Sequence, residues 1–302
     1  MKIESFKIEE WMNKYEASAT YDLTTTCIAP LSVNELPFEK SIFDVKLSYG
    51  DILGSNRLKT AIKSLYTNQE LENITVTHGA IGANQLVFLS LLEKGDEVVS
   101  IVPTYQQHYS IPKSLACNVK LLFLKEENNW LPDLEELKNL VTKKTKLLCL
   151  NNPNNPTGAV IPDKMLMEIV DIAKENNCWI LSDEVYRGLN LTDNAYSISV
   201  ADIYDKGISV GSMSKTYSLP GLRAGWIASR LDLINEINHQ RQYNTISVSI
   251  LDDYFASIAI ENREKISERN FKIMKNGIKI LKAWLDKNPD IDCILPSGGT
   301  TV

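Results

Sequence analysis

Short apolar runs rich in β-branched residues alternate with segments of helical periodicity along most of the chain, from Asn73 to Ser229. Such runs fit strands that are buried on both faces, and the helical segments supply the crossovers that parallel strands need. The pattern predicts an α/β fold with a mostly parallel central sheet flanked by helices. The expected strands are Ile74–Val76, Glu97–Val102, Val119–Leu124, Lys146–Leu150, Trp179–Ser182, Ile208–Gly211 and Gly225–Ser229. The clearest expected helices are Ala83–Leu92, Leu134–Val141 and Lys164–Glu175.

A different organisation is expected after Ser229. Helical periodicity covers Leu231–Tyr243 and about 247–285, and Asp292–Leu295 resembles one further strand. Because the chain stops at Val302, where another strand is expected to begin, the last unit is predicted to be a truncated α+β domain. The expected parts are an N-terminal arm with part of a small domain (1–45), a large domain (46–240), and a long helix with the start of the C-terminal small domain (241–302).

Charge and composition narrow the class of protein. Lysine and arginine number 32 against 38 aspartate and glutamate residues, a net charge of −6, and no basic block offsets it. The sequence therefore gives no support for a nucleic-acid or membrane-surface partner. No apolar run approaches the roughly 18 residues that span a bilayer, and the first residues do not resemble a signal peptide. The five cysteines are scattered, so we expect a reduced, cytoplasmic, soluble protein without a metal site.

A lysine with chemical potential follows the expected strand that ends at Gly211. In Ser212-Met-Ser-Lys-Thr-Tyr-Ser-Leu-Pro-Gly-Leu-Arg, Lys215 lies in a loop of small residues, and Arg223 follows eight residues later. In α/β folds, loops at the carboxyl ends of strands gather ligands. Lysine amines form imines with aldehydes, and arginine binds phosphate through paired hydrogen bonds. A solvated surface lysine is the alternative for Lys215 taken alone.

A carboxylate also follows an expected strand directly. Asp183, in Ile-Leu-Ser-Asp-Glu-Val-Tyr, comes after a buried run, and Tyr186 lies three residues further. A carboxylate at this place could pair with a protonated ring nitrogen and raise that nitrogen's pKa. The alternative is an aspartate that caps the segment behind the strand.

Two further loops have features of a binding site. Asn-Asn-Pro-Asn-Asn-Pro-Thr-Gly forms a stiff polar loop after a buried strand and would fix the amide of Asn155, although a purely structural turn is the alternative. The segment Val-Thr-His-Gly-Ala-Ile-Gly reads as a strand, a turn and the start of a helix. The free amides at such a helix start bind phosphate well, although many turns of this kind look alike.

Together these segments resemble the class I/II aminotransferases, the pyridoxal-phosphate-dependent enzymes of fold type I. The resemblance runs from about Tyr49 to Val302, and Asn-Asn-Pro-Thr-Gly, Ser-Asp-Glu-Val-Tyr and Ser-Met-Ser-Lys occur in the family's order. It implies pyridoxal 5′-phosphate as cofactor, held as a Schiff base on Lys215. It also implies amino acid and 2-oxo acid substrates and a homodimer with shared active sites.

The resemblance implies roles for individual residues. Lys215 would bond the cofactor and then move protons during the reaction, while Asp183 would pair with the ring nitrogen. Asn155 and Tyr186 would hydrogen-bond the phenolate oxygen of the ring. The phosphate would be held by Ser212, Arg223 and the amides of Gly79, Ala80 and Ile81. Tyr105 would stack on the ring, and Tyr49 would reach the phosphate of the neighbouring subunit.

Two departures from the family's pattern concern the substrate. The family binds the substrate carboxylate with an arginine late in the small domain, and this chain ends before that position. The arm reads Leu23-Thr-Thr-Thr-Cys-Ile-Ala-Pro, where the family often has glycines.

Two histidines lie near these segments. His78 reads as a packed or hydrogen-bonded neighbour of the phosphate turn. His108 could face the pocket or lie on a helix surface.

The leading functional hypothesis is transfer of an amino group from an L-amino acid to a 2-oxo acid. A β-lyase or an amino-acid oxidase would use the same fold and the same lysine, and no visible residue separates these from a transaminase. A non-catalytic sensor of the same fold, attached to a DNA-binding module, is the third alternative. The intact Lys215, the acidic balance and the lack of a helix-turn-helix segment disfavour the sensor.

Overall fold

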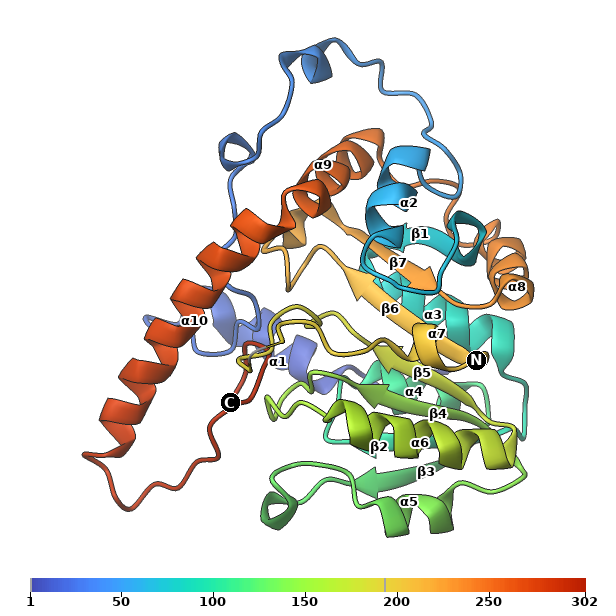
Figure 1. The fold of residues 1–302 in the computed structure, drawn as a ribbon, viewed down its shortest axis with the longest axis vertical. Helices are drawn as coiled ribbons and strands as arrows, with labels where there is room; N and C mark the ends of the chain where they lie inside the picture. The colour runs from blue at the N-terminus through green and yellow to red at the C-terminus, as the bar shows by residue number, and fades with distance from the viewer. Residues whose placement is uncertain (1, 193) are drawn as a thin grey trace.

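The computed structural model describes residues 2–192 and 194–302, and its centre is a seven-stranded sheet with helices on both faces (Figure 1). Across the sheet the order is β1-β7-β6-β5-β4-β2-β3. The strands from β6 to β3 run parallel, whereas β7 is antiparallel to both β6 and β1. The strands are β1 (Ile74–His78), β2 (Glu97–Val102), β3 (Asn118–Phe123), β4 (Thr145–Asn151), β5 (Trp179–Asp183), β6 (Gly207–Ser212) and β7 (Ala224–Ala228). The predicted mostly parallel α/β fold is confirmed, and each expected strand of this sheet lies within a few residues of its predicted bounds.

Helices cover both faces of the sheet because strand residues alternate in direction. In β4, Leu147 and Cys149 join the core on one face, and Leu148 and Leu150 join the core on the other. The first face is covered by α3 (Gly79–Leu91), α4 (Gln107–Ser114) and α8 (Leu231–Arg241). The second is covered by α2 (Asn56–Lys63), α5 (Leu134–Leu140), α6 (Asp163–Asn176), α7 (Val200–Ile203) and α9 (Ile250–Glu261). The strands are therefore buried on both faces, as their near-continuous apolar sequence indicates.

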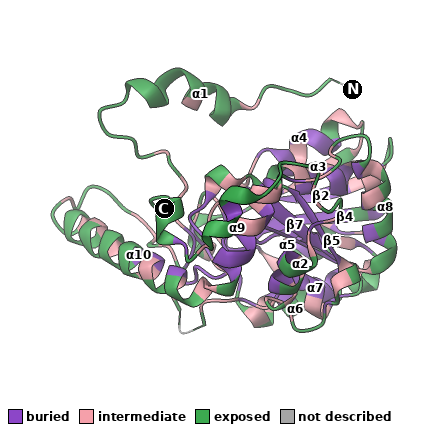
Figure 2. Ribbon diagram, turned by 90° about the horizontal axis from the view of Figure 1, so that it is seen from above, coloured by how far each residue is buried: buried purple, intermediate pink, exposed green. Residues whose placement is uncertain are grey.

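The expected helical stretch at about 247–285 is two helices in the structure. Helix α9 ends at Glu261, and the 23-residue helix α10 runs from Arg263 to Leu285. Asn262 separates them because its backbone leaves the helical region and its side-chain amide donates to Ile258 O at 2.8 Å. Helix α10 extends away from the sheet, and its exposed residues predominate (Figure 2).

The expected strand Asp292–Leu295 is wrong. These residues are irregular and pair with no strand, and the pairing nearest in sequence is an isolated bridge between Asn190 and Gly298. An apolar alternating stretch becomes a strand only when another strand accepts its hydrogen bonds. The predicted domain boundaries at 45 and 240 stay a prediction.

The N-terminal residues form an arm outside the sheet, as expected. It contains α1 (Lys7–Tyr15), which has no buried residue and projects from the main body (Figure 2), and which is tied to it where the backbone N–H of Lys7 donates to Gln106 Oε1 at 3.0 Å. The 3-10 turns Glu16–Ser18, Val33–Glu35 and Lys40–Asp44 continue it. Among the residues that the structure describes, no helix is both long and apolar enough to cross a membrane.

Candidate active site

The carboxyl ends of three neighbouring parallel strands meet at one edge of the sheet. Asn151 at the end of β4 lies opposite Asp183 at the end of β5, and Asp183 lies opposite Val210 of β6. Strand β6 continues to Ser212, which lies opposite Gly225 of β7, and Gly225 in turn lies opposite Thr77 of β1. Strand register therefore gathers at one edge of the sheet the four segments that the sequence singles out, which follow β1, β4, β5 and β6.

Asp183 is nearly buried and is surrounded by polar groups. Its Oδ2 accepts a hydrogen bond from Asn84 Nδ2 at 2.8 Å and lies 3.6 Å from His108 Nε2. Its Oδ1 accepts from the backbone N–H of Val185 at 3.2 Å. Oδ1 thus caps the turn behind β5, as expected if Asp183 were only a capping residue. Oδ2 is directed at Asn84 of α3 and His108 of α4, which cover one face of the sheet.

His108 is completely buried, so the surface position weighed for it is wrong. Its Nδ1 lies 3.2 Å from Thr104 Oγ1, and its Nε2 has no hydrogen-bond partner among the described residues. Helix α4 begins immediately before His108 and places it near Asp183.

Asn84, one turn into α3, is a site residue that sequence reasoning does not identify, because an amide inside an apolar helix gives no distinctive signal.

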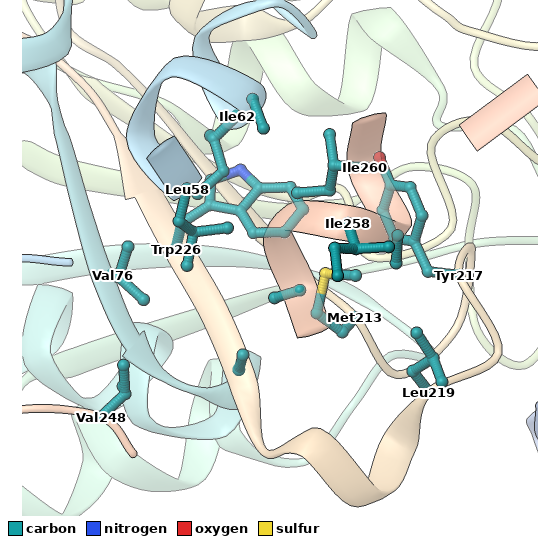
Figure 3. Packing of buried hydrophobic residues seen from close by; sticks show 14 of the residues in the cluster. Leu58, Ile62, Val76, Met213, Tyr217, Leu219, Trp226, Val248, Ile258 and Ile260 are labelled. Atoms are coloured by element: carbon teal, nitrogen blue, oxygen red, sulfur yellow. The ribbon is translucent and has the colours of Figure 1, made fainter. Parts of the chain in front are cut away.

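Lys215 lies in the loop between β6 and β7. Met213 and Tyr217, two residues to either side, are buried in the core beside Trp226 and fix the loop (Figure 3). Lys215 itself is half-buried, and its Nζ lies 6.0 Å from the centre of the Tyr186 ring. The loop is therefore held by its apolar residues while the lysine is left free to point into the site.

Two residues of the arm contact the amine of Lys215. The amine donates to Thr26 Oγ1 at 2.6 Å and lies 3.2 Å from Cys27 Sγ. Neither residue was assigned to the site from sequence. The sequence departs from the family's glycine-rich pattern in this segment of the arm. That departure indicates that the segment is unusual, but it does not single out Thr26 and Cys27.

Arg223 lies against the start of α3. Gly79 has a positive φ of +64°, which favours glycine, and a Cβ built there would be 3.2 Å from Arg223 Nη2, a tight contact that the guanidinium would have to relieve by shifting. Gly225 is more tightly constrained, since its Cβ would lie 2.5 Å from the backbone C of Gly79 and 2.8 Å from the backbone N of Ala80. The result is a cradle in which an exposed arginine faces the first amides of α3, those of Gly79, Ala80 and Ile81. Backbone amides at a helix start and an arginine suit a phosphate.

His78 lies beside this cradle. Its Nδ1 is 3.2 Å from Thr245 Oγ1, so it is a hydrogen-bonded neighbour, as expected. Burial lowers the pKa of His78, and the nearby Arg241 and Arg223 lower it further. At neutral pH this imidazole is held uncharged, which leaves Arg223 as the exposed cation of the cradle.

The remaining expected residues differ in their surroundings. Tyr105 contacts Phe6 of the arm, with ring centres 4.9 Å apart. Tyr186 is 2% exposed, its hydroxyl has no partner among the described residues, and burial raises its pKa. Asn155 is half-buried and its backbone N–H donates to Asn151 Oδ1 at 2.7 Å. Tyr49 is 80% exposed and makes no hydrogen bond within the described chain, so it is not brought to this chain's own site.

Comparison with known proteins identifies the family. Residues 30–301 match the family model described as aminotransferase class I and II. The chain belongs to this family. The predicted resemblance is therefore confirmed, and it includes part of the arm that precedes Tyr49.

Several relatives and solved structures are similar to this aminotransferase-family chain. A crystal structure of a PLP-dependent aminotransferase from Streptococcus suis 89-1591 shares 44% identity with a TM-score of 0.94, over 98% of this chain and 81% of that one. Capreomycidine synthase of Streptomyces vinaceus is 28% identical over 97% of this chain and 77% of its own length. An aspartate aminotransferase of Pyrococcus horikoshii is 32% identical over 76% of this chain, and the match spans 59% of that protein's length.

The family is PLP-dependent, and the residues of the site fit that cofactor. The Gly79 cradle beside Arg223 has the amides and the cation that a phosphate requires. The buried, unpaired hydroxyl of Tyr186 offers a hydrogen bond to a ring oxygen. Asp183 offers a carboxylate for a ring nitrogen, and the amine of Lys215 is available for an aldehyde. Among residues 2–192 and 194–302, no three metal-binding side chains cluster.

Proposed function

We propose that this chain is a transaminase that moves an amino group from an L-amino acid to a 2-oxo acid, with pyridoxal phosphate bonded to Lys215. The observation that carries this proposal is the position of the lysine. It lies three residues beyond the end of β6, next to the strand that ends in Asp183, in the loop that leads to Arg223. When bound, the cofactor supplies an electron sink for the substrate carbon that loses a proton.

The chain's own residues then bind, orient and move protons. Arg223 and the amides of α3 hold the phosphate, together with Ser212 at the end of β6. Asp183 keeps a proton on the ring nitrogen, and Asn84 holds the carboxylate in place through a hydrogen bond, with His108 Nε2 3.6 Å from the same oxygen. Lys215 carries the proton that leaves the substrate Cα.

Three other expected residues complete the proposed site. Tyr186 and Asn155 hydrogen-bond the ring oxygen, and burial of Tyr186 favours its protonated form, which can donate. Tyr105 covers one face of the ring. The arm, through Phe6 and Thr26, closes the site from the substrate's side.

A second reaction on the same cofactor is favoured by one observation. Capreomycidine synthase matches 97% of this chain, more than the 76% matched by the Pyrococcus aspartate aminotransferase. Because this relative is named a synthase and not an aminotransferase, the second candidate is another reaction on the same cofactor, a β-elimination or an amino-acid oxidation. No side chain of the site decides between them.

Acceptor dependence separates the two candidates. The cofactor-loaded protein is incubated with a panel of L-amino acids, first without any 2-oxo acid and then with one. A transaminase forms one product per site and stops until the acceptor is added, whereas a lyase or an oxidase continues without it. Continued turnover without acceptor would therefore exclude transamination.

The lysine is tested separately from the reaction type. Borohydride reduction followed by peptide mapping should fix the cofactor on Lys215, because reduction makes an imine bond permanent. Lys215→Ala should lower kcat by at least about 100-fold, since it removes the proton carrier as well as the bond. A cofactor fixed on any other lysine would overturn the assignment.

A further inference from the structure

A thiol lies against the lysine proposed to hold the cofactor. Cys27 Sγ is 3.2 Å from Lys215 Nζ, and the neighbouring Thr26 Oγ1 accepts a hydrogen bond from the same amine at 2.6 Å. Sulfur and nitrogen are thus at contact distance, with the nitrogen oriented by a second partner. Neither the transamination proposed above nor its alternatives use this sulfur.

The contact is held by bonds on both sides of Cys27. Before it, the carbonyl of Thr26 accepts from Thr300 Oγ1 at 2.6 Å. After it, Ala29 O accepts from Arg269 at 2.9 Å, and the N–H of Leu31 donates to Ser218 O at 2.9 Å in the loop that carries Lys215. Because the arm is fastened to the same loop as the lysine, the thiol and the amine are kept together.

The other cysteines lack this arrangement. Burial raises the pKa of Cys178 to about 12 and that of Cys149 well above its usual range, so both thiols stay protonated in the core. Burial and Asp96 raise the pKa of Cys117. A protonated thiol is a poor nucleophile and is oxidised slowly. Of the five cysteines, Cys27 is the one whose sulfur accepts a hydrogen bond from a lysine amine among the described residues.

We propose that Cys27 and Lys215 form a modification site, at which a peroxide joins them through a reversible sulfur–nitrogen bond. The thiol is first oxidised to sulfenic acid, while the peroxide O–O bond is reduced and one water is released. The amine then attacks the sulfur, the S–O bond breaks, and the hydroxyl leaves with the amine's proton as a second water. Two electrons pass from sulfur to the peroxide in total.

The bond would switch off the site reversibly. With its nitrogen on sulfur, Lys215 can no longer bond an aldehyde. A small thiol reverses the link, because its sulfur attacks Cys27 Sγ, the S–N bond breaks and the amine takes up the proton; a second thiol then releases Cys27 as a free thiol. If Lys215 holds the cofactor, as the proposed function states, the link forms only while the amine is free.

Peptide mapping tests the link on the full chain after removal of the cofactor. Hydrogen peroxide is added at a low, stoichiometric level, the remaining thiols are blocked, and the digest is analysed by mass spectrometry. We expect the peptides containing Cys27 and Lys215 to be joined, with a mass about 2 Da below their sum, and to separate after treatment with dithiothreitol. Oxidised Cys27 that is found only as an acid or as a disulfide, with Lys215 unmodified, would overturn the proposal.

Matched variants localise the chemistry. Cys27→Ser should abolish the joined peptide, whereas Cys117→Ser, which removes another partly exposed cysteine, should leave it unchanged. A joined peptide that persists in Cys27→Ser would contradict the site. The cofactor-loaded chain is treated in parallel. If the link forms as fast in the cofactor-loaded chain as in the cofactor-free chain, the modification site is still supported. That result would count against Lys215 as the residue that holds the cofactor.

Discussion

Asp183 has two different duties in the structure, one for each carboxylate oxygen. Oδ1 accepts from the backbone of Val185 and fixes the turn behind β5, whereas Oδ2 faces Asn84 and His108. An amide in place of the carboxylate could keep the first duty through its oxygen. It could not hold a proton on a ring nitrogen, because it carries no negative charge.

Asp183→Asn should therefore retain the fold and the bound cofactor while kcat falls by roughly 100-fold or more. The measurement is kcat at saturating amino donor, alongside the absorbance spectrum of the cofactor. Asp163→Asn is the matched control, since Asp163 also accepts from a backbone N–H, that of Ile198 at 3.1 Å, but outside the site. Near-normal turnover in Asp183→Asn would show that Asp183 only caps the turn.

Sequence patterns locate site residues that follow strands, and fail for residues that reach the site from elsewhere. The position of Asp183 and Lys215 at one edge of the sheet could be predicted because strand ends of a parallel sheet share an edge, whereas the role of Ser212 was implied by the family resemblance alone. Thr26 and Cys27 could not, because the contact of an irregular arm with a loop some 190 positions away depends on tertiary packing. His108 remained ambiguous because its direction depends on where α4 begins.

At the scale of elements, Glu97 at the start of β2 fastens three strands. It pairs with Lys120 of β3 at 2.8 Å and accepts a hydrogen bond from Thr142 at 3.1 Å and another from Thr145 of β4. Burial alone would raise the pKa of Glu97, but the bonds from Lys120, Thr145 and Thr142 outweigh it and lower the pKa. Because its folded-state pKa is depressed, Glu97 stabilises the fold above its unfolded-state pKa and loses this effect as the pH falls through the folded-state value.

Glu97→Gln should lower the free energy of unfolding by about 1–3 kcal/mol at pH 7, because the charged acceptor of a mostly buried network is lost. The deficit should shrink in acid, once the wild-type carboxylate is itself protonated. Urea unfolding of both proteins at several pH values measures the difference. Glu135→Gln is a suitable control, since Glu135 pairs with Lys138 at an exposed position, where such pairs contribute little. A Glu97→Gln deficit that is independent of pH would contradict the charge-based explanation.

The strands were predictable from sequence where their neighbours are also strands. Glu97–Val102 has its predicted bounds, since its apolar run is bounded by charged and turn residues. Asp292–Leu295 shows the limit, because its alternation has no partner to bond with. Helix α4 was expected only as one of two surroundings for His108, and Pro112 inside it normally argues against a helix.

At the scale of the whole molecule, the position of Tyr49 is informative. Tyr49 is 80% exposed, and Phe43, Leu47 and Ile52 in the same stretch are exposed as well. Exposed apolar residues that follow one another along a segment mark a surface for association. We predict a homodimer in which this stretch covers the neighbouring subunit and Tyr49 reaches its phosphate site.

Mixing two inactive variants tests this prediction. In a mixed dimer, Lys215→Ala and Tyr49→Ala damage the same site if Tyr49 acts across the interface. One site then carries both defects and the other carries none, so the mixed dimer should regain about half of the wild-type activity. The control is a mixture of Lys215→Ala and Asp183→Asn. If Asp183 and Lys215 act in the same chain's site, each site of this mixed dimer carries one defect, and no activity should return. Mixed dimers that form but regain nothing would place Lys215 and Tyr49 in one chain's site.

The order of strands has a consequence for the newly made chain. Strand β1 is complete at His78, but β7, its neighbour in the sheet, begins only at Ala224. The strands β2, β3, β4, β5 and β6 can pair with one another as they leave the ribosome, whereas β1 must wait with unpaired backbone groups and apolar side chains. We expect chains arrested before Ala224 to be held by chaperones or to aggregate, and chains arrested well beyond Ala228 to be protected against proteases in their sheet.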